Sequence, residues 1–77
     1  MCLAIPSKVI EIKNDNTVIV DTMGSKRLVS TMLLEEQVKM GDYLLIHVGY
    51  AMQKIDEEEA LESLNLFREI ESKIAGR

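Results

Sequence analysis

The chain has 77 residues, of which 47% are hydrophobic and 29% charged, with a net charge of -4 at pH 7. This length allows one small domain, and a single cysteine excludes an internal disulfide, as expected in the reducing cytoplasm. No apolar run approaches the roughly 20 residues of a membrane-spanning helix, so we expect a cytoplasmic protein that does not cross a membrane.

The negative charge is unevenly distributed along the chain. Residues 1–54 carry equal numbers of acidic and basic side chains, so residues 55–77 hold the whole excess. Nucleic-acid-binding proteins usually present a basic stripe that neutralises phosphates. No such stripe is visible, and only three aromatic residues are present for base stacking. We therefore expect no nucleic acid among the partners.

The first two thirds of the chain predict five short strands, because β-branched or apolar stretches alternate with turn-forming residues. We expect the strands at residues 8–13, 17–22, 26–31, 43–49 and 50–55, and a connection at 32–39 that packs Leu33, Leu34 and Val38 on the core. Turns at a spacing of about 8–12 residues are typical of a small barrel. We predict a mainly β fold with a five-stranded OB-like β-barrel, and an SH3-like barrel is the alternative.

Residues 56–74 predict an amphipathic α-helix. Asp56 is a suitable N-cap, and the glutamates that follow it lie where the helix dipole favours negative charge. Large apolar residues recur three or four positions apart and so share a face: Leu61, Leu64, Phe67, Ile70 and Ile74. We expect a barrel over residues 1–55 and a C-terminal helix over residues 56–77 that packs on the barrel or on a partner.

Cys2 is the first residue with evident chemistry. If Met1 is removed, Cys2 carries a free amine beside its thiol, and this positive charge favours the thiolate that binds metals. Free cysteines are often small buried hydrophobes, but residues near a chain end are usually exposed, so we favour a reactive or metal-binding role. Pro6 disfavours a helical Ile5, so residues 2–5 are expected to be extended.

His47 is the only histidine. By alternation it shares a face of its strand with Tyr43 and Leu45, and the strand is apolar on both faces up to His47, which indicates a central position. A lone histidine in such a strand is more often structural than a ligand, but the unusual Cys2 favours a functional role. A catalytic dyad oriented by Asp42 is disfavoured because nothing suggests an oxyanion hole, so we expect no enzyme.

Cys2 and His47 are too few for a structural zinc site, which takes four ligands. A thiolate and an imidazole suit iron or copper better than magnesium or calcium. Two donors leave most coordination positions empty, so the metal must bring its own ligands or share those of a partner. Such open coordination suits a carrier, which must also release its metal.

Three stretches of the chain resemble the HupF/HypC family of small chaperones for [NiFe]-hydrogenase maturation. Residues 1–6 (MCLAIP) are similar to the family's N-terminal signature, residues 41–51 (GDYLLIHVGYA) to its second block, and residues 55–60 (IDEEEA) to the start of its C-terminal helix. Ser7 stands where the family commonly has glycine, and Tyr50 where phenylalanine is frequent.

The resemblance implies an OB-like barrel with a C-terminal helix and no enzyme activity. It implies that the chain binds HypD, on which iron acquires cyanide and carbon monoxide ligands, and escorts this iron to the hydrogenase large-subunit precursor. The family's essential cysteine corresponds to Cys2 and its histidine to His47, which we expect to hold the transient iron together with a partner. Partner contacts are expected at Cys2, Leu3, Ala4, Ile5, Pro6, His47, Gly49 and Tyr50.

Three other functions stay open. A nucleic-acid-binding OB module would bind RNA in a salt-dependent manner. A thiol redox protein would be oxidised at Cys2 without any hydrogenase partner. An interaction adaptor without a metal role would tolerate the loss of both Cys2 and His47.

Overall fold

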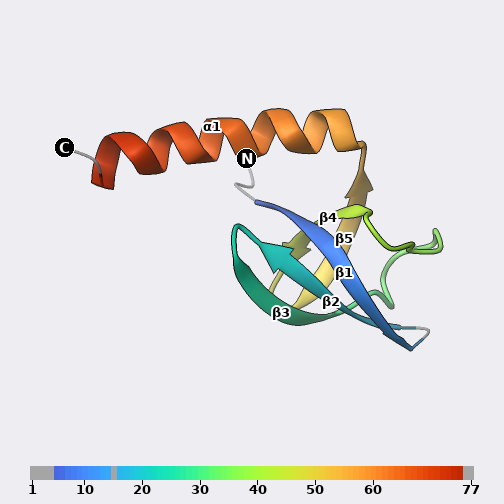
Figure 1. The fold of residues 1–77 in the computed structure, drawn as a ribbon. Helices are drawn as coiled ribbons and strands as arrows, with labels where there is room; N and C mark the ends of the chain where they lie inside the picture. Colours follow the sequence, from blue (N-terminus) through green and yellow to red (C-terminus); the bar gives the residue numbers. More distant parts are fainter. Residues whose placement is uncertain (1–4, 15, 76–77) are drawn as a thin grey trace.

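The computed structural model describes residues 5–14 and 16–75. A closed barrel of five strands is followed by one helix (Figure 1), which confirms the predicted mainly β architecture. The elements are β1 (Pro6–Asn14), β2 (Thr17–Thr22), β3 (Ser25–Ser30), β4 (Tyr43–His47), β5 (Tyr50–Ile55) and α1 (Glu57–Ala75). Within the described residues, no helix combines the length and the apolar character that crossing a membrane requires.

The strands are arranged around the barrel in the order β1-β2-β3-β5-β4, and β4 pairs with β1 to close it. Neighbouring strands are antiparallel, except that β3 and β5 are parallel and meet where Ser30 faces Tyr50. This order, in which the last strand lies between the third and the fourth, is that of an OB-like barrel. The central position of the fourth strand is confirmed, because β4 has a paired neighbour on each side.

Two tight turns connect antiparallel neighbours. Met23 and Gly24 join β2 to β3, and Val48 and Gly49 join β4 to β5, with φ values of 49°, 95°, 52° and 80°. Positive φ at both central residues is characteristic of a type I′ turn, whose twist matches that of the flanking strands. The fourth strand therefore ends at His47. The sequence pattern had placed its end at Gly49, two residues too late.

The barrel core consists of alternate, inward-facing strand residues. Its buried members are Val9, Val18, Val20, Val29, Leu44 and Ala51. From the connection between β3 and β4, Leu34 and Val38 pack against this core as predicted. The prediction is wrong for Leu33, which is 54% exposed. The reason is a turn closed by a 3.0 Å hydrogen bond from the Leu34 N–H to the Thr31 carbonyl, which puts Leu33 at its tip.

A second cluster joins α1 to the outer face of the barrel. Tyr43 of β4 is buried together with Ala60 and Leu64 of α1, and three half-buried residues pack around them: Ile5, Met23 and Ile55. Asp56 directly precedes α1, and its carbonyl accepts a 2.9 Å hydrogen bond from the Ala60 N–H, as expected of an N-cap residue.

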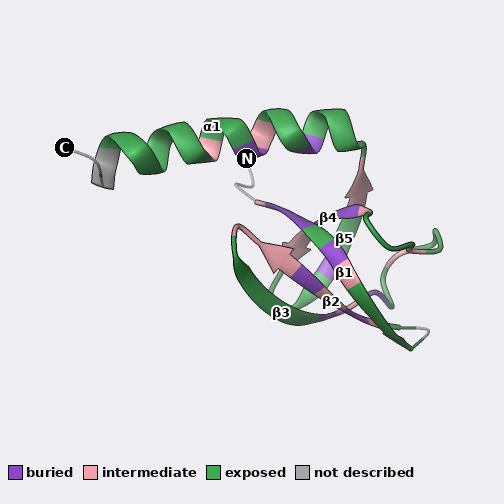
Figure 2. Cartoon of the chain, in the orientation of Figure 1, coloured by how far each residue is buried: buried purple, intermediate pink, exposed green. Residues whose placement is uncertain are grey.

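Only the first half of α1 packs on the barrel. Figure 2 shows the buried residues of α1 near its start, whereas the rest of the helix is largely exposed and extends beyond the barrel. Of the predicted apolar face, Leu64 is buried, but Leu61 and Ile70 are 43% and 46% exposed. The pattern omitted Ala60, which is fully buried, and Leu61 lies about 100° further around the helix. The side chain of Ile74 lies outside the described residues.

Candidate functional site

The predicted site residues come from two segments, the start of the chain and the hairpin between β4 and β5. The structure describes Ile5, Pro6, His47, Gly49 and Tyr50. The other three predicted residues lie outside the described part of the chain: Cys2, Leu3 and Ala4. The structure thus locates the residues at which the start of the chain joins β1, which are Ile5 and Pro6.

The pairing of β1 with β4 brings the two segments together. Pro6 faces Leu45, and Ser7 faces Leu44, in an antiparallel register. Because antiparallel strands run in opposite directions, the beginning of β1 lies beside the end of β4. That end is His47, two residues beyond Leu45. The fold therefore directs the start of β1 toward the strand end that carries the imidazole.

Ile5 and Pro6 are anchored in the fold itself. Pro6 is buried, and Ile5 packs against the cluster that joins α1 to the barrel. Ser7 follows with 1% exposure, and its hydroxyl lies 2.7 Å from that of Thr22 and donates to the Ile5 carbonyl at 3.3 Å. These contacts fix the position and direction of the chain at the entry to β1.

His47 is exposed on the outer face of the barrel. Leu44 and Ile46 pack into the barrel core, so alternation turns Leu45 and His47 outward. His47 therefore shares a face with Leu45, as predicted. Across the hairpin, His47 faces Tyr50, which is 42% exposed. An exposed imidazole is accessible to a metal or a partner.

Val48, in the same hairpin, is a candidate that the sequence pattern did not single out. Its side chain is 80% exposed, and its φ of 52° is unfavourable for a β-branched residue. Strained residues of this kind cluster at functional sites. The signal was present in the sequence, because Val48 precedes Gly49 in a turn where Asn-Gly or Asp-Gly is preferred.

Asp42 does not orient His47. Its carboxylate lies 3.3 Å from the Lys54 ammonium group and accepts a 2.8 Å hydrogen bond from the Lys39 N–H. Asp42 directly precedes β4, whereas His47 ends that strand, about 17 Å further along. The alternative of a catalytic dyad supported by Asp42 is therefore wrong.

Few groups in the described chain could hold a metal ion. Residues 5–14 and 16–75 contain no group of three or more His, Cys, Asp or Glu side chains with that arrangement. His47 alone provides one imidazole donor at the candidate site. A metal held there needs further ligands from Cys2, from a partner or from its own bound molecules.

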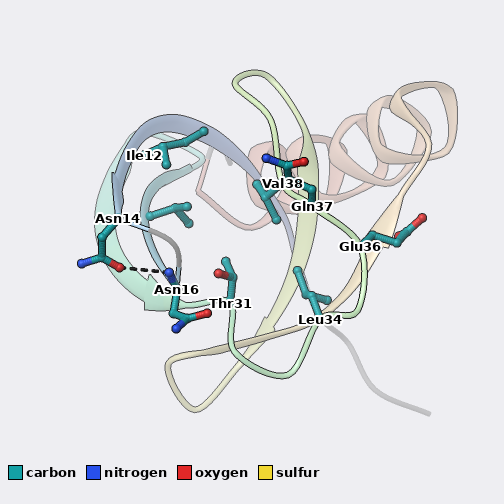
Figure 3. Close-up of a pocket in the computed structure, with 9 residues that line it drawn as sticks. Ile12, Asn14, Asn16, Thr31, Leu34, Glu36, Gln37 and Val38 are labelled. Atoms are coloured by element: carbon teal, nitrogen blue, oxygen red, sulfur yellow. Dashed lines mark hydrogen bonds between the residues drawn. The ribbon is translucent and has the colours of Figure 1, made fainter.

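A hollow of about 270 Å³ lies near the far end of β1 (Figure 3). Side chains from β1, the turn after it, β2 and the connection between β3 and β4 line it: Ile12, Asn14, Asn16, Val18, Thr31, Leu34, Glu36, Gln37 and Val38. The Asn16 N–H donates to Asn14 Oδ1 at 2.9 Å beside it. No predicted site residue lines this hollow, which is separate from the candidate site.

The sequence matches the model of the HupF/HypC family over residues 1–67, a range that includes every predicted site residue. Hydrogenase maturation factor HypC of Helicobacter hepaticus is 59% identical over 70 residues, which cover 91% of this chain and 81% of that protein. The factor of the same name from Rhizobium leguminosarum bv. viciae is 52% identical over 69 residues, or 90% and 91% of the two chains. That from Cupriavidus necator is 46% identical over 71 residues, or 92% and 78%.

Proposed function

Since this chain belongs to the HupF/HypC family, we propose that it is a hydrogenase maturation factor that acts as a chaperone and not as an enzyme. It binds a HypD-type maturation protein and the precursor of a [NiFe]-hydrogenase large subunit. Its cargo is an iron atom that carries cyanide and carbon monoxide, which it helps to assemble and delivers to the precursor. The match over most of the chain and the shared name of the relatives support the maturation role.

The observation that carries the proposed cargo site is the position of the start of β1 beside the exposed His47. At full extension, the chain from Cys2 to Pro6 spans at most about 14 Å. His47 lies two residues, or about 7 Å, from Leu45, which faces Pro6. The chain between Pro6 and Cys2 is thus long enough for the thiol to reach the imidazole, so both groups can bind one iron atom.

The chemistry of the cargo suits this small donor set. Cyanide and carbon monoxide occupy several coordination positions of the iron, so the chaperone needs to supply only one or two donors. A soft thiolate and a borderline imidazole are suitable donors for such an iron. A partner supplies a further ligand, and the weak hold of two donors permits release.

The test is to purify the chain with its HypD partner from cells and to record infrared spectra and iron content. We expect bands of metal-bound cyanide and carbon monoxide from the wild-type complex. Cys2→Ala is expected to abolish complex formation and iron transfer, and Cys2→Ser separates loss of the soft donor from loss of side-chain volume. If binding and transfer both survive in Cys2→Ala, the role assigned to the thiol is wrong, and an adaptor without a metal role is favoured.

A further inference from the structure

One edge of β3 has no strand beside it in the described chain. β2 pairs with β3 along its whole length, from Ser25 to Ser30, but β5 meets β3 only where Ser30 faces Tyr50. Since β3 and β5 are parallel, β5 continues past the end of β3 and leaves residues 25–29 without a neighbour among the described strands. In Figure 1 this part of β3 lies on the outer rim of the barrel, next to the turn that joins it to β2.

The hydrogen-bond directions along β3 identify the free backbone groups. The Ser30 N–H donates to the Gly49 carbonyl at 3.0 Å, away from β2. Hydrogen-bonded and non-hydrogen-bonded residues alternate along an antiparallel strand. Lys26 and Leu28 therefore also point their N–H and C=O groups away from β2, whereas Arg27 is paired with β2. An edge with such groups is a template for another strand.

The side chains at this edge indicate what kind of strand fits it. Lys26 and Arg27 are exposed, and neither forms an ion pair with a described residue. Because consecutive strand residues point to opposite faces, Lys26 lies on the outer face, where Asp21 of β2 is opposite it, and Arg27 lies on the other face. Leu28 is 64% exposed and shares the outer face with Lys26. An added strand would place one side chain beside Lys26 and another, two residues away, beside Leu28. An acidic residue is favoured beside Lys26 and an apolar residue beside Leu28.

We propose that residues 25–29 of β3 dock an extended segment of a partner protein by strand addition. The segment carries an acidic residue two positions from an apolar one, and its backbone bonds to Lys26 and Leu28. A second copy of this chain is disfavoured, because pairing two β3 edges would bring the basic residues of both copies together. This surface does not depend on Cys2, on His47 or on iron, so it stands apart from the proposed cargo site.

The test uses the full chain labelled with 15N and, as the probe, the synthetic glutamate–valine hexapeptide Thr-Val-Thr-Glu-Thr-Val, in which the glutamate lies two positions from each valine and so shares a face with them. In the free protein, we expect the amide hydrogens of Lys26 and Leu28 to exchange faster than those of Arg27 and Val29. At saturating peptide, we expect their exchange to slow by about tenfold or more. A lysine–valine peptide, with lysine in place of the glutamate, controls for charge. The glutamate–valine peptide N-methylated at alternate residues controls for backbone pairing. Neither control is expected to bind.

Variants of β3 make the test specific. Leu28→Pro removes an outward N–H that has no role in pairing with β2, and proline is tolerated at such an edge. We expect it to abolish peptide binding, whereas the matched Leu28→Ala retains it within a few fold. If Leu28→Pro does not fold, Lys26→Glu with Arg27→Glu is expected to reverse the preference in favour of the lysine–valine peptide. Protected Lys26 and Leu28 amides in the free protein, a dimer formed through β3, or binding that maps elsewhere would overturn the proposal.

Discussion

The Asp42 carboxylate lies 3.3 Å from the Lys54 ammonium group, and both side chains are about three-quarters covered, with 24% and 25% exposure. The same carboxylate accepts a 2.8 Å hydrogen bond from the Lys39 N–H. Lys54 also donates to the Gln37 carbonyl at 3.2 Å. This network attaches the irregular connection between β3 and β4 to β5, and so holds Leu34 and Val38 over the barrel core.

We expect Asp42→Ala to lower the free energy of unfolding by about 2 kcal/mol, because it removes hydrogen bonds made by a charged, partly buried acceptor. Asp42→Asn retains an acceptor for the Lys39 N–H and should cost about 1 kcal/mol or less. Urea titrations measure both values. Lys54→Met completes a double-mutant cycle with Asp42→Ala, and a coupling energy near zero would contradict the network.

The hydroxyl pair of Ser7 and Thr22, at 2.7 Å, gives a second prediction. Ser7→Ala leaves the Thr22 hydroxyl without this partner, and Thr22→Val leaves the buried Ser7 hydroxyl with only the longer bond to the Ile5 carbonyl. Each substitution should cost about 1 kcal/mol. The double substitution should cost less than the sum of the two. Strictly additive losses in urea titrations would show that the hydroxyls do not depend on each other.

The strands could be predicted from the sequence because each is a short β-branched or apolar stretch bounded by turn-forming residues. β2 was predicted at its observed bounds, and β3 one residue late, because the turn at Met23 and Gly24 has two residues and not three. In these strands every second residue faces the core, and this alternation can be seen in the sequence itself.

The proximity of the start of β1 to the hairpin between β4 and β5 could not be predicted in the same way. The pairing of Pro6 with Leu45 joins residues far apart in the chain and depends on how the barrel closes. The exposure of His47 depends on the same closure, and on the end of β4 at the Val48–Gly49 turn. The chemical types of Cys2 and His47 were visible in the sequence, but their spatial relationship was not.

The turn between β4 and β5 is expected to tolerate replacement of Val48 better than replacement of Gly49. Val48→Asn should stabilise the fold by up to about 1 kcal/mol, because asparagine adopts positive φ more readily than valine. Gly49→Ala should destabilise it by about 1 kcal/mol, and since an added Cβ would meet no atom within 4 Å, the cost is conformational. Val48→Ile keeps the branched side chain and should leave the urea midpoint unchanged; a gain for Val48→Ile equal to that for Val48→Asn would argue against strain at this residue.

His47 is expected to matter for iron and not for folding. Because its side chain is exposed, His47→Ala should change the free energy of unfolding by no more than about 0.5 kcal/mol. Iron retention or release in the complex with HypD should be impaired, but less than in Cys2→Ala, as read from iron content and infrared bands. An unfolded His47→Ala protein, or one that handles iron like the wild type, would contradict the proposed role.

The placement of α1 predicts a large contrast between two leucines on the same helix. Leu64 is 6% exposed in the cluster with Tyr43 and Ala60, whereas Leu66 is 57% exposed. Leu64→Ala should cost about 2–3 kcal/mol through lost packing. Leu66→Ala makes the same chemical change two residues away and should stay within about 0.5 kcal/mol. Urea titrations compare the two, and equal losses would mean that α1 meets the barrel through a different face.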